Sequence, residues 1–423
     1  MKTNCLLLLL LAATTVSAAD WPEFRGPNGD NTSPGEKILT SFPDSGPKIM
    51  WSMNVSPGYG GSAIVGEEVF FMDRIGDQKD VIRCVSLQDG KERWSWEFEA
   101  VGRINHPGSR GVPTVTKDAV YASSGYGHVY CIDRSTHKER WVVNVVKTFG
   151  SDVPRFGYSI HPLIHGDHCI IAPTDSVGLA ALDKKTGKTV WKSESIGGSH
   201  SSPALAKILG QELVVMPGTG DGNMTLSGFD PSNGKRLFHY TEKLTSGRFN
   251  PIPNLTMIDE ATAFLTEGYG FGTRVLKFAK SGGKIEVKLA KSSDVEGRIH
   301  PVLKVEDRYY VSATGGGGRR SRSRDSAGLV CFDKTGKELW RTGNDLKVSD
   351  GSIISVGGII VSQHGGDGTL RLIQPGPSYK ELAKAKIFKD EPGDELWAPL
   401  AFASGKLIMR SQNQIVCVSL EAK

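Results

Sequence analysis

A segment of about eleven residues recurs along this chain and constrains its fold more than any other feature. The clearest copy is Ala181–Trp191 (ALDKKTGKTVW), and related copies stand at Cys84–Trp94 (CVSLQDGKERW), Cys131–Trp141 (CIDRSTHKERW) and Cys331–Trp340 (CFDKTGKELW). The copies are spaced about 48 residues apart, and Phe238 and Val287 are expected to take the two Trp places missing between Trp191 and Trp340. A repeat of this length indicates one supersecondary unit copied around a ring or along a solenoid.

The unit itself reads as four short strands. In the third copy, the apolar segments Pro162–Gly166, Cys169–Ala172 and Gly178–Asp183 are separated by turns, and Thr186–Gly187 leads into Lys188–Ser195. Short β-rich runs joined by Gly-containing turns indicate antiparallel strands. A four-stranded meander repeated at this period predicts the blades of a β-propeller.

The chain accommodates eight such units, which predicts an all-β, eight-bladed propeller of four-stranded antiparallel blades. The predicted units are 59–100, 106–146, 158–196, 200–243, 248–290, 298–343, 349–389 and 394–423. The last unit is one strand short, and Lys48–Val55, with Trp51 in the usual phase, is predicted to supply that strand and close the ring. Closure leaves no open sheet edge. We therefore expect one propeller domain over 48–423, preceded by an extension over 20–47.

The first residues read as a secretory signal. Met1–Ala19 has one Lys near its start, an apolar run from Leu6 to Ala13 and small residues before a cleavage point. The run is too short for a membrane span. We expect a periplasmic or secreted monomer with no transmembrane segment. The net charge of +5 is mild, so it does not indicate a nucleic-acid partner.

Cysteine usage agrees with the repeat. Cys84, Cys131, Cys331 and Cys417 occupy the same place in four units, where Ala181 stands in another. The shared property is small size, so we interpret them as small buried hydrophobic residues. Equivalent positions in different blades are too far apart for disulfides. A metal or redox cluster is the alternative.

The segment Ala181–Trp191 matches the A-x-D-x-x-T-G-K-x-x-W pattern of the PQQ-like (quinoprotein-type) β-propellers, which the chain thus resembles. The resemblance implies that each Trp docks on the neighbouring blade, over the small first residue and the turn glycine, as represented by Ala181 and Gly187. The docking residues would be Trp51, Trp94, Trp141, Trp191 and Trp340. In build the chain is similar to BamB-type outer-membrane assembly propellers and to the larger PQQ-dependent alcohol dehydrogenases. The opening Trp21–Gly29 (WPEFRGPNG) is similar to the start of many exported PQQ-like proteins.

In a propeller, the loops that enter the first strand of each blade meet around the central channel on one face. Here these loops carry an unusual share of Arg and His. The predicted ligand-binding funnel comprises Arg103, His106, Arg110, Arg155, Tyr158, His161, His200, Arg248, Arg298, His300 and Trp397. Arg favours carboxylate, phosphate or sulfate, and aromatic faces suit sugars. We expect an anionic small molecule or glycan, or another envelope protein, as the partner. The alternative is that these side chains are solvated at a channel mouth.

Three classes of function follow. A non-catalytic binding or scaffold propeller is favoured, because the chain lacks a nucleophile elbow, an H-E-x-x-H motif and a Walker loop. A polysaccharide-active enzyme using funnel His, Arg and carboxylates is the second. A PQQ-dependent dehydrogenase is the third, but the adjacent Cys pair that this resemblance implies is missing, so no cofactor and no metal are expected. The Arg319–Arg324 loop is interpreted as a solvated excursion, with polyanion binding as its alternative.

Overall fold

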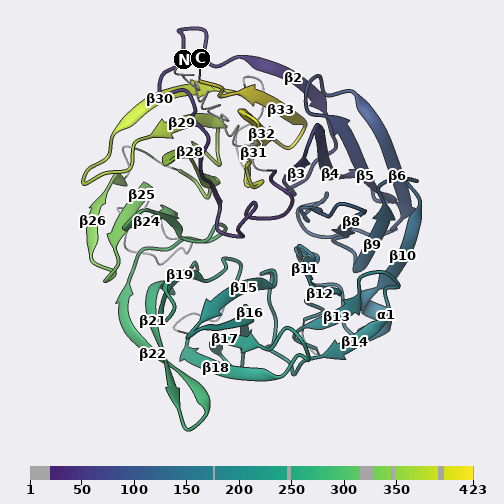
Figure 1. Ribbon diagram of the computed structural model, residues 1–423, viewed down its shortest axis with the longest axis vertical. Helices are drawn as coiled ribbons and strands as arrows, with labels where there is room; N and C mark the ends of the chain where they lie inside the picture. The colour runs from purple at the N-terminus through teal and green to yellow at the C-terminus, as the bar shows by residue number, and fades with distance from the viewer. Residues whose placement is uncertain are drawn as a thin grey trace, which may run out of the picture.

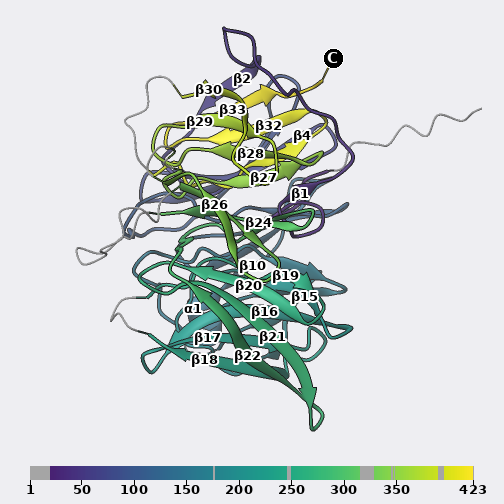
Figure 2. The ribbon, with the colours of Figure 1, turned by 90° about the vertical axis from the view of Figure 1, so that its left-hand side faces the viewer.

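The computed structural model describes residues 20–174, 177–244, 249–314, 328–343, 346, 348–388 and 395–422. The predicted signal segment 1–19 and the loop Arg319–Arg324 lie outside these residues. The described chain forms eight sheets around a ring, each with four antiparallel strands, which confirms the eight-bladed propeller (Figure 1). Viewed edge-on, the extension before the first blade and β1 lie on one side of the ring (Figure 2).

Each of the first four blades is a meander of four strands in sequence order. Blade one contains β3 (Ser62–Val65), β4 (Glu68–Ile75), β5 (Lys79–Ser86) and β6 (Glu92–Glu99). Blade two contains β7 (Thr114–Val115), β8 (Ala119–Ser123), β9 (His128–Asp133) and β10 (Glu139–Asn144), followed by the short helix α1 (Val145–Phe149). Blade three contains β11 (Leu163–His165), β12 (His168–Ile171), β13 (Ala180–Asp183) and β14 (Thr189–Lys192). Blade four contains β15 (Ala204–Ile208), β16 (Gln211–Gly220), β17 (Asn223–Phe229) and β18 (Arg236–Lys243).

The second half repeats the pattern with two additions from the N-terminal part of the chain. Blade five contains β19 (Thr256–Asp259), β20 (Thr262–Glu267), β21 (Gly272–Ser281) and β22 (Lys284–Ser293). Blade six contains β23 (Leu303–Val305), β24 (Arg308–Ala313), β25 (Gly328–Asp333) and β26 (Glu338–Arg341). Blade seven contains β27 (Ile353–Val356), β28 (Ile359–Gln363), β29 (Thr369–Ile373) and β30 (Glu381–Lys386), with β1 (Thr32–Ser33) added beside β27. Blade eight contains β31 (Ala401–Ala403), β32 (Lys406–Arg410) and β33 (Gln414–Ser419), with β2 (Ile49–Asn54) as its fourth strand.

Ring closure occurs where β2 pairs with β33. Trp51 lies opposite Cys417, the same register in which Trp94 lies opposite Cys84 in blade one. The indole of Trp51 then crosses to blade one, where its Nε1 donates to the carbonyl oxygen of Leu87 at 2.9 Å. The N-terminal strand therefore both completes the last blade and docks it on the first.

The Trp docking contact recurs between blades. A Cβ added at Gly187 of blade three would lie 2.8 Å from the ring of Trp141 in blade two. Trp94 instead stacks on the imidazole of His137, with ring centroids 4.9 Å apart. Gly187 has a φ of 72°, a left-handed conformation that L side chains rarely adopt. The turn therefore needs glycine for both its backbone conformation and its contact.

Blade five departs from the expected pattern. The residue in register with the docking tryptophans is Lys291, which pairs with Val275 beside the bulge of β22, whereas Val287 pairs with Phe278 further along the strand. The expectation that Val287 takes the Trp place is therefore wrong. The turn glycine of blade six, Gly336, contacts Val275 and the Lys291 stem instead of an indole. Because the β21–β22 hairpin is long, the position that Trp takes in other blades falls on Lys291 here. Figure 1 shows this hairpin projecting beyond the ring.

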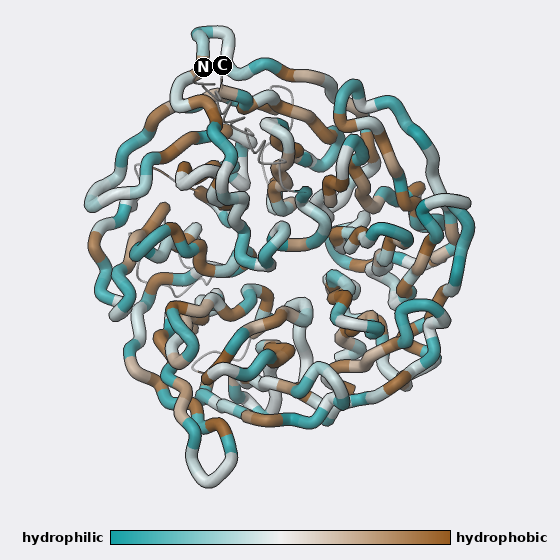
Figure 3. Tube along the Cα trace, in the orientation of Figure 1, coloured by the Kyte–Doolittle hydropathy of each residue, from teal (hydrophilic) through white to brown (hydrophobic). Residues whose placement is uncertain are grey.

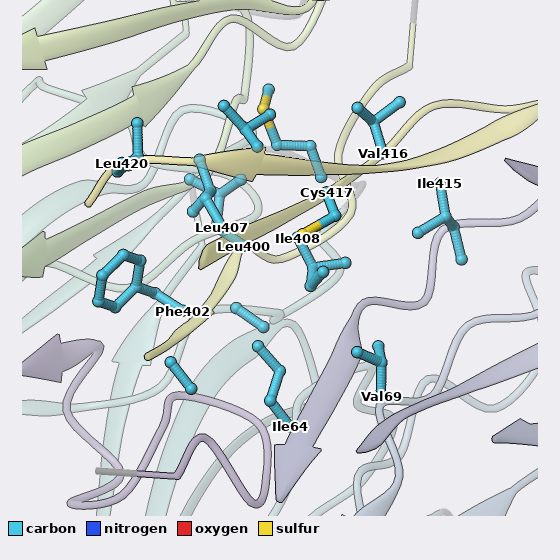
Figure 4. Packing of buried hydrophobic residues seen from close by; sticks show 14 of the residues in the cluster. Ile64, Val69, Leu400, Phe402, Leu407, Ile408, Ile415, Val416, Cys417 and Leu420 are labelled. Carbon is cyan, nitrogen blue, oxygen red and sulfur yellow. The ribbon is translucent and has the colours of Figure 1, made fainter. Parts of the chain in front are cut away.

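The core is distributed between neighbouring blades rather than gathered at one centre. Hydrophobic stretches recur in the strands all around the ring (Figure 3). Between blades eight and one, Ile408, Cys417 and Phe402 pack in one cluster with Ile64 and Val69 (Figure 4). All five cysteines of the described chain are free and buried, as expected for small apolar residues. Burial raises the pKa of the Cys84 thiol, which keeps it protonated and unreactive.

The extension over 20–47 crosses the ring on the near face in Figure 1. Trp21 exchanges two backbone hydrogen bonds with Ile64 of β3, and Thr32–Ser33 pairs in parallel with the inner strand of blade seven. The Trp21 side chain is 1 % exposed. The extension thus connects blade one to blade seven, past blade eight, before it reaches β2. Within the described residues, no helix is long and apolar enough to cross a membrane.

Candidate functional site

A cavity of about 480 Å³ lies in the ring, among the loops that enter the inner strands. Seven of the eleven predicted funnel residues line it. They are His106, Arg110, His161, His200, Arg298, His300 and Trp397. These loops come from blades two, three, four, six and eight, so the site exists only because the ring brings them together.

The other four predicted funnel residues do not line the cavity. Arg103 and Arg155 are exposed, and Arg155 lies over the ring of Phe156 at 5.5 Å. Tyr158 is 2 % exposed, and its hydroxyl donates to the carbonyl oxygen of Asp152 at 2.9 Å, so it is part of the packing behind the site. Arg248 lies outside the described residues.

Three of the histidines are held neutral by burial. Desolvation lowers the pKa of His161 to about 3 and the pKa values of His200 and His300 to about 4. The Nδ1 atom of His161 accepts a hydrogen bond from the Val112 amide at 2.7 Å. A neutral imidazole that accepts at Nδ1 carries its proton on Nε2. His161 therefore offers a donor, not a positive charge.

Arg110 is the cation with the least compensation in the cavity wall. Its residue is 9 % exposed, and its Nη2 donates to the carbonyl oxygens of Asn105 and His106. Among the described residues, no carboxylate lies within ion-pair distance of this guanidinium. Burial lowers its pKa to about 10, so it remains charged at neutral pH. A buried charge without a counterion favours an anion beside it.

Arg298 is partly neutralised. It forms an ion pair with Asp350, which is 4 % exposed. The guanidinium also lies 5.8 Å from the ring centre of Trp397. Because Asp350 offsets much of this charge, the cavity is less basic than the count of Arg and His predicts.

A hydrogen-bonded network joins three blades at the cavity. The Tyr59 hydroxyl donates to Glu395 Oε2 at 2.5 Å, and His106 Nδ1 lies 3.0 Å from the same oxygen. The side chains of His106 and Glu395 are 40 % and 33 % exposed, so the network faces solvent through the mouth. Desolvation and the bond to Glu395 raise the pKa of Tyr59, which keeps it protonated.

The extension contributes to the cavity wall. Phe24 stacks on the imidazole of His161 with centroids 3.9 Å apart, and both rings also border a second cavity of about 180 Å³. Phe24 therefore separates the two cavities. The segment Trp21–Gly29 thus supplies Phe24 to the wall of both cavities and further residues to the second.

Sequence reasoning left several aromatic residues out of the predicted set. Phe24, Tyr59 and Phe156 line the cavity, as does Tyr269. Tyr59 stands three residues before β3, in the same kind of entry loop as the predicted His residues. The reasoning that selected the entry loops could therefore have included it. Nothing local in the sequence places Phe24, because its position depends on the path of the extension.

The donor set does not resemble that of a calcium-bound quinone site. The described residues contain no group of three or more His, Cys, Asp and Glu placed to hold a metal ion. Asp350 is already paired with Arg298, and the chain has no adjacent cysteines. The residues present therefore do not fit this cofactor.

Comparison with known proteins supports the family resemblance. A family model described as outer membrane protein assembly factor BamB matches residues 78–249. No curated protein matches the chain. The resemblance to BamB and PQQ-like propellers is confirmed by this match together with the solved structures below.

Three solved structures share the fold. BamB from Moraxella catarrhalis is 17 % identical with a TM-score of 0.62, over 88 % of this chain and 99 % of that one. A europium-containing methanol dehydrogenase is 14 % identical with a TM-score of 0.66, over 95 % and 89 %. The quinohemoprotein alcohol dehydrogenase from Comamonas testosteroni is 13 % identical with a TM-score of 0.64, over 96 % and 81 %. At these identities the likeness extends to the fold alone, since one fold hosts many functions.

Proposed function

We propose that this protein is an exported propeller of the cell envelope that binds a carboxylated glycan in its central cavity. The observation that carries the proposal is the buried Arg110 guanidinium, which has no carboxylate within ion-pair distance among the described residues, in a wall rich in aromatic rings and neutral imidazoles. A carboxylate would supply the missing counterion, and guanidinium recognises it with charge-assisted hydrogen bonds.

The rest of the lining suits a sugar ring. Tyr59 and Trp397 stand side by side with centroids 5.6 Å apart and offer apolar faces to C–H groups. His161 offers a hydrogen-bond donor to hydroxyl groups. The volume of about 480 Å³ falls within the range of small-molecule sites, about 300–1,000 Å³.

An envelope location agrees with the predicted signal segment and with the family name that the match carries, which concerns an outer-membrane assembly factor. Scaffolding of another envelope protein stays as the second proposal on the same grounds. A quinone-dependent dehydrogenase is not proposed, because the described donor set does not fit.

The test is calorimetric titration of the purified protein with oligogalacturonate and with its carboxyl-reduced, neutral counterpart. We expect binding of the acidic form only, weakening as salt is added. Arg110→Met should weaken binding by roughly 10-fold to 100-fold, because charged hydrogen bonds contribute about 1.5–3 kcal/mol.

Arg103→Ala is the matched control, since this exposed arginine belongs to the same entry loop but lies outside the cavity. Trp397→Leu should also weaken binding, and it removes no charge. Equal affinity for both glycan forms, or equal losses in Arg110→Met and Arg103→Ala, would contradict a carboxylate site at Arg110.

A further inference from the structure

We propose that the cavity also cleaves the glycan it binds, by β-elimination, with His106 as the general base. This inference rests on the proposed function, because it requires a sugar carboxylate beside Arg110. It is carried by the Tyr59–Glu395–His106 network, which simple binding of a glycan does not require.

The hydrogen bonds of this network determine which nitrogen of His106 is basic. Tyr59 has one hydroxyl hydrogen, and it is donated to Glu395 at 2.5 Å. His106 Nδ1 lies 3.0 Å from the same carboxylate oxygen and 3.4 Å from the Tyr59 oxygen. Both neighbours can only accept from it, so Nδ1 must carry a hydrogen. In the neutral ring, the lone pair is then on Nε2.

This arrangement is that of an oriented general base. A carboxylate that holds Nδ1–H fixes the tautomer and the direction of an imidazole, and it stabilises the imidazolium formed when Nε2 takes a proton. Glu395 and Tyr59 act through His106 and are positioning residues. His106 has a φ of 55° and Glu395 a φ of 69°, left-handed conformations that persist only where the surroundings hold them.

The cation needed for the reaction lies next to the base. Arg110 donates to the carbonyl oxygen of His106 itself, and its guanidinium lies 5.2 Å from the ring centre of Tyr59. Trp397 lies 6.1 Å from His106 and 5.6 Å from Tyr59, centroid to centroid. Base, cation and stacking platform therefore surround one space.

Proton abstraction beside a carboxylate is the reaction class that these groups serve. Pairing with Arg110 withdraws charge from the carboxylate, and so makes the hydrogen on the adjacent carbon more acidic. Acyl transfer is less well served, because the Ser202 hydroxyl in the wall accepts from the His161 amide and donates to the Ser159 carbonyl.

Nε2 of His106 takes the hydrogen from C5 of the uronic acid, and the C5–H electron pair becomes the C4=C5 bond. The C4–O4 bond breaks with its electrons on oxygen, which takes a proton from a water molecule at the open mouth. The imidazolium then returns its proton to solvent. The products are a reducing end and an unsaturated uronic acid.

The experiment incubates the purified protein separately with polygalacturonate, alginate and chondroitin sulfate, and follows the ultraviolet absorbance of the conjugated product. We expect the absorbance to rise with at least one of them. His106→Ala should lower the rate by about 100-fold to 10,000-fold, the usual contribution of a general base. The affinity measured by calorimetry should change much less.

His165→Ala is the matched control, because His165 also faces a carboxylate, Glu212 at 3.6 Å, but lies outside the cavity. Glu395→Gln should lower kcat and leave KM nearly unchanged, which general unfolding would not do. Binding without any rise in absorbance, or equal rates in His106→Ala and the wild type, would overturn the elimination and leave the binding function standing. If the protein binds none of the three glycans, both the elimination and the proposed binding function are overturned.

Discussion

The contact between Trp141 and Gly187 can be tested by comparing two glycines of blade three. Gly187 and Gly166 both have left-handed backbones, with φ values of 72° and 56°. An added Cβ at Gly187 would lie 2.8 Å from the Trp141 ring, whereas at Gly166 it would meet nothing within 4 Å. Alanine at either site costs about 1–2 kcal/mol for the left-handed conformation. Only Gly187→Ala adds overpacking, about 1–3 kcal/mol.

The expected difference in the free energy of unfolding between the two variants is therefore about 1–3 kcal/mol, with Gly187→Ala the less stable. The entropy that alanine removes from the unfolded chain is the same in both and cancels. Urea unfolding followed by tryptophan fluorescence measures the midpoints. Coincident midpoints at equal m would refute the idea that the Trp141 contact requires glycine at position 187.

Two further predictions concern the tryptophans and the pH dependence. Trp141→Phe should cost about 1 kcal/mol more than Trp191→Phe in urea unfolding, because Nε1 of Trp141 donates to a carbonyl of the next blade at 3.1 Å, whereas Nε1 of Trp191 has no partner among the described residues. His161, His200 and His300 bind protons less readily when folded, with pKa values of about 3, 4 and 4, than in the unfolded chain, about 6.5. Their contribution to stability is complete above pH 6.5 and is lost as the pH falls toward 4, by roughly 1.4 kcal/mol per pH unit for each histidine. Urea midpoints measured from pH 7 to 4.5 should fall more steeply for the wild type than for His300→Gln, and parallel curves would contradict a buried, neutral His300.

The fold could be predicted because its determinants are local and repeated. The Trp at the end of each unit and the small residue opposite it are separated by one hairpin, so a fixed spacing places both in register. The same reasoning failed for Val287, because β21 and β22 are ten residues each and the longer hairpin shifts the register to Lys291. Aligning the repeats by their period therefore predicts equivalent positions only where the hairpins have the same length.

The site was predictable to the extent that it follows from the ring. Residues such as His161 and His300 precede equivalent inner strands, and the ring brings those positions to one cavity. Whether a side chain turns inward is decided by loop conformation, and so Arg110 lines the cavity while Arg103 of the same loop is exposed. Phe24 lay beyond prediction, because its place depends on pairing between segments far apart in the chain.

The conformations of the entry loops link the fold to the proposed chemistry. His106, Tyr269, Asp350 and Glu395 all have positive φ values, between 55° and 69°, and all belong to or border the cavity wall. Such conformations cost of order 1–3 kcal/mol each, and they persist only where the surroundings hold them. Here the inter-blade docking of the tryptophans supplies a rigid ring that can hold four of them at once. Weakening the docking should therefore damage the cavity before it unfolds the blades. Under Gly187→Ala, loss of glycan affinity should precede loss of β-structure as urea is added.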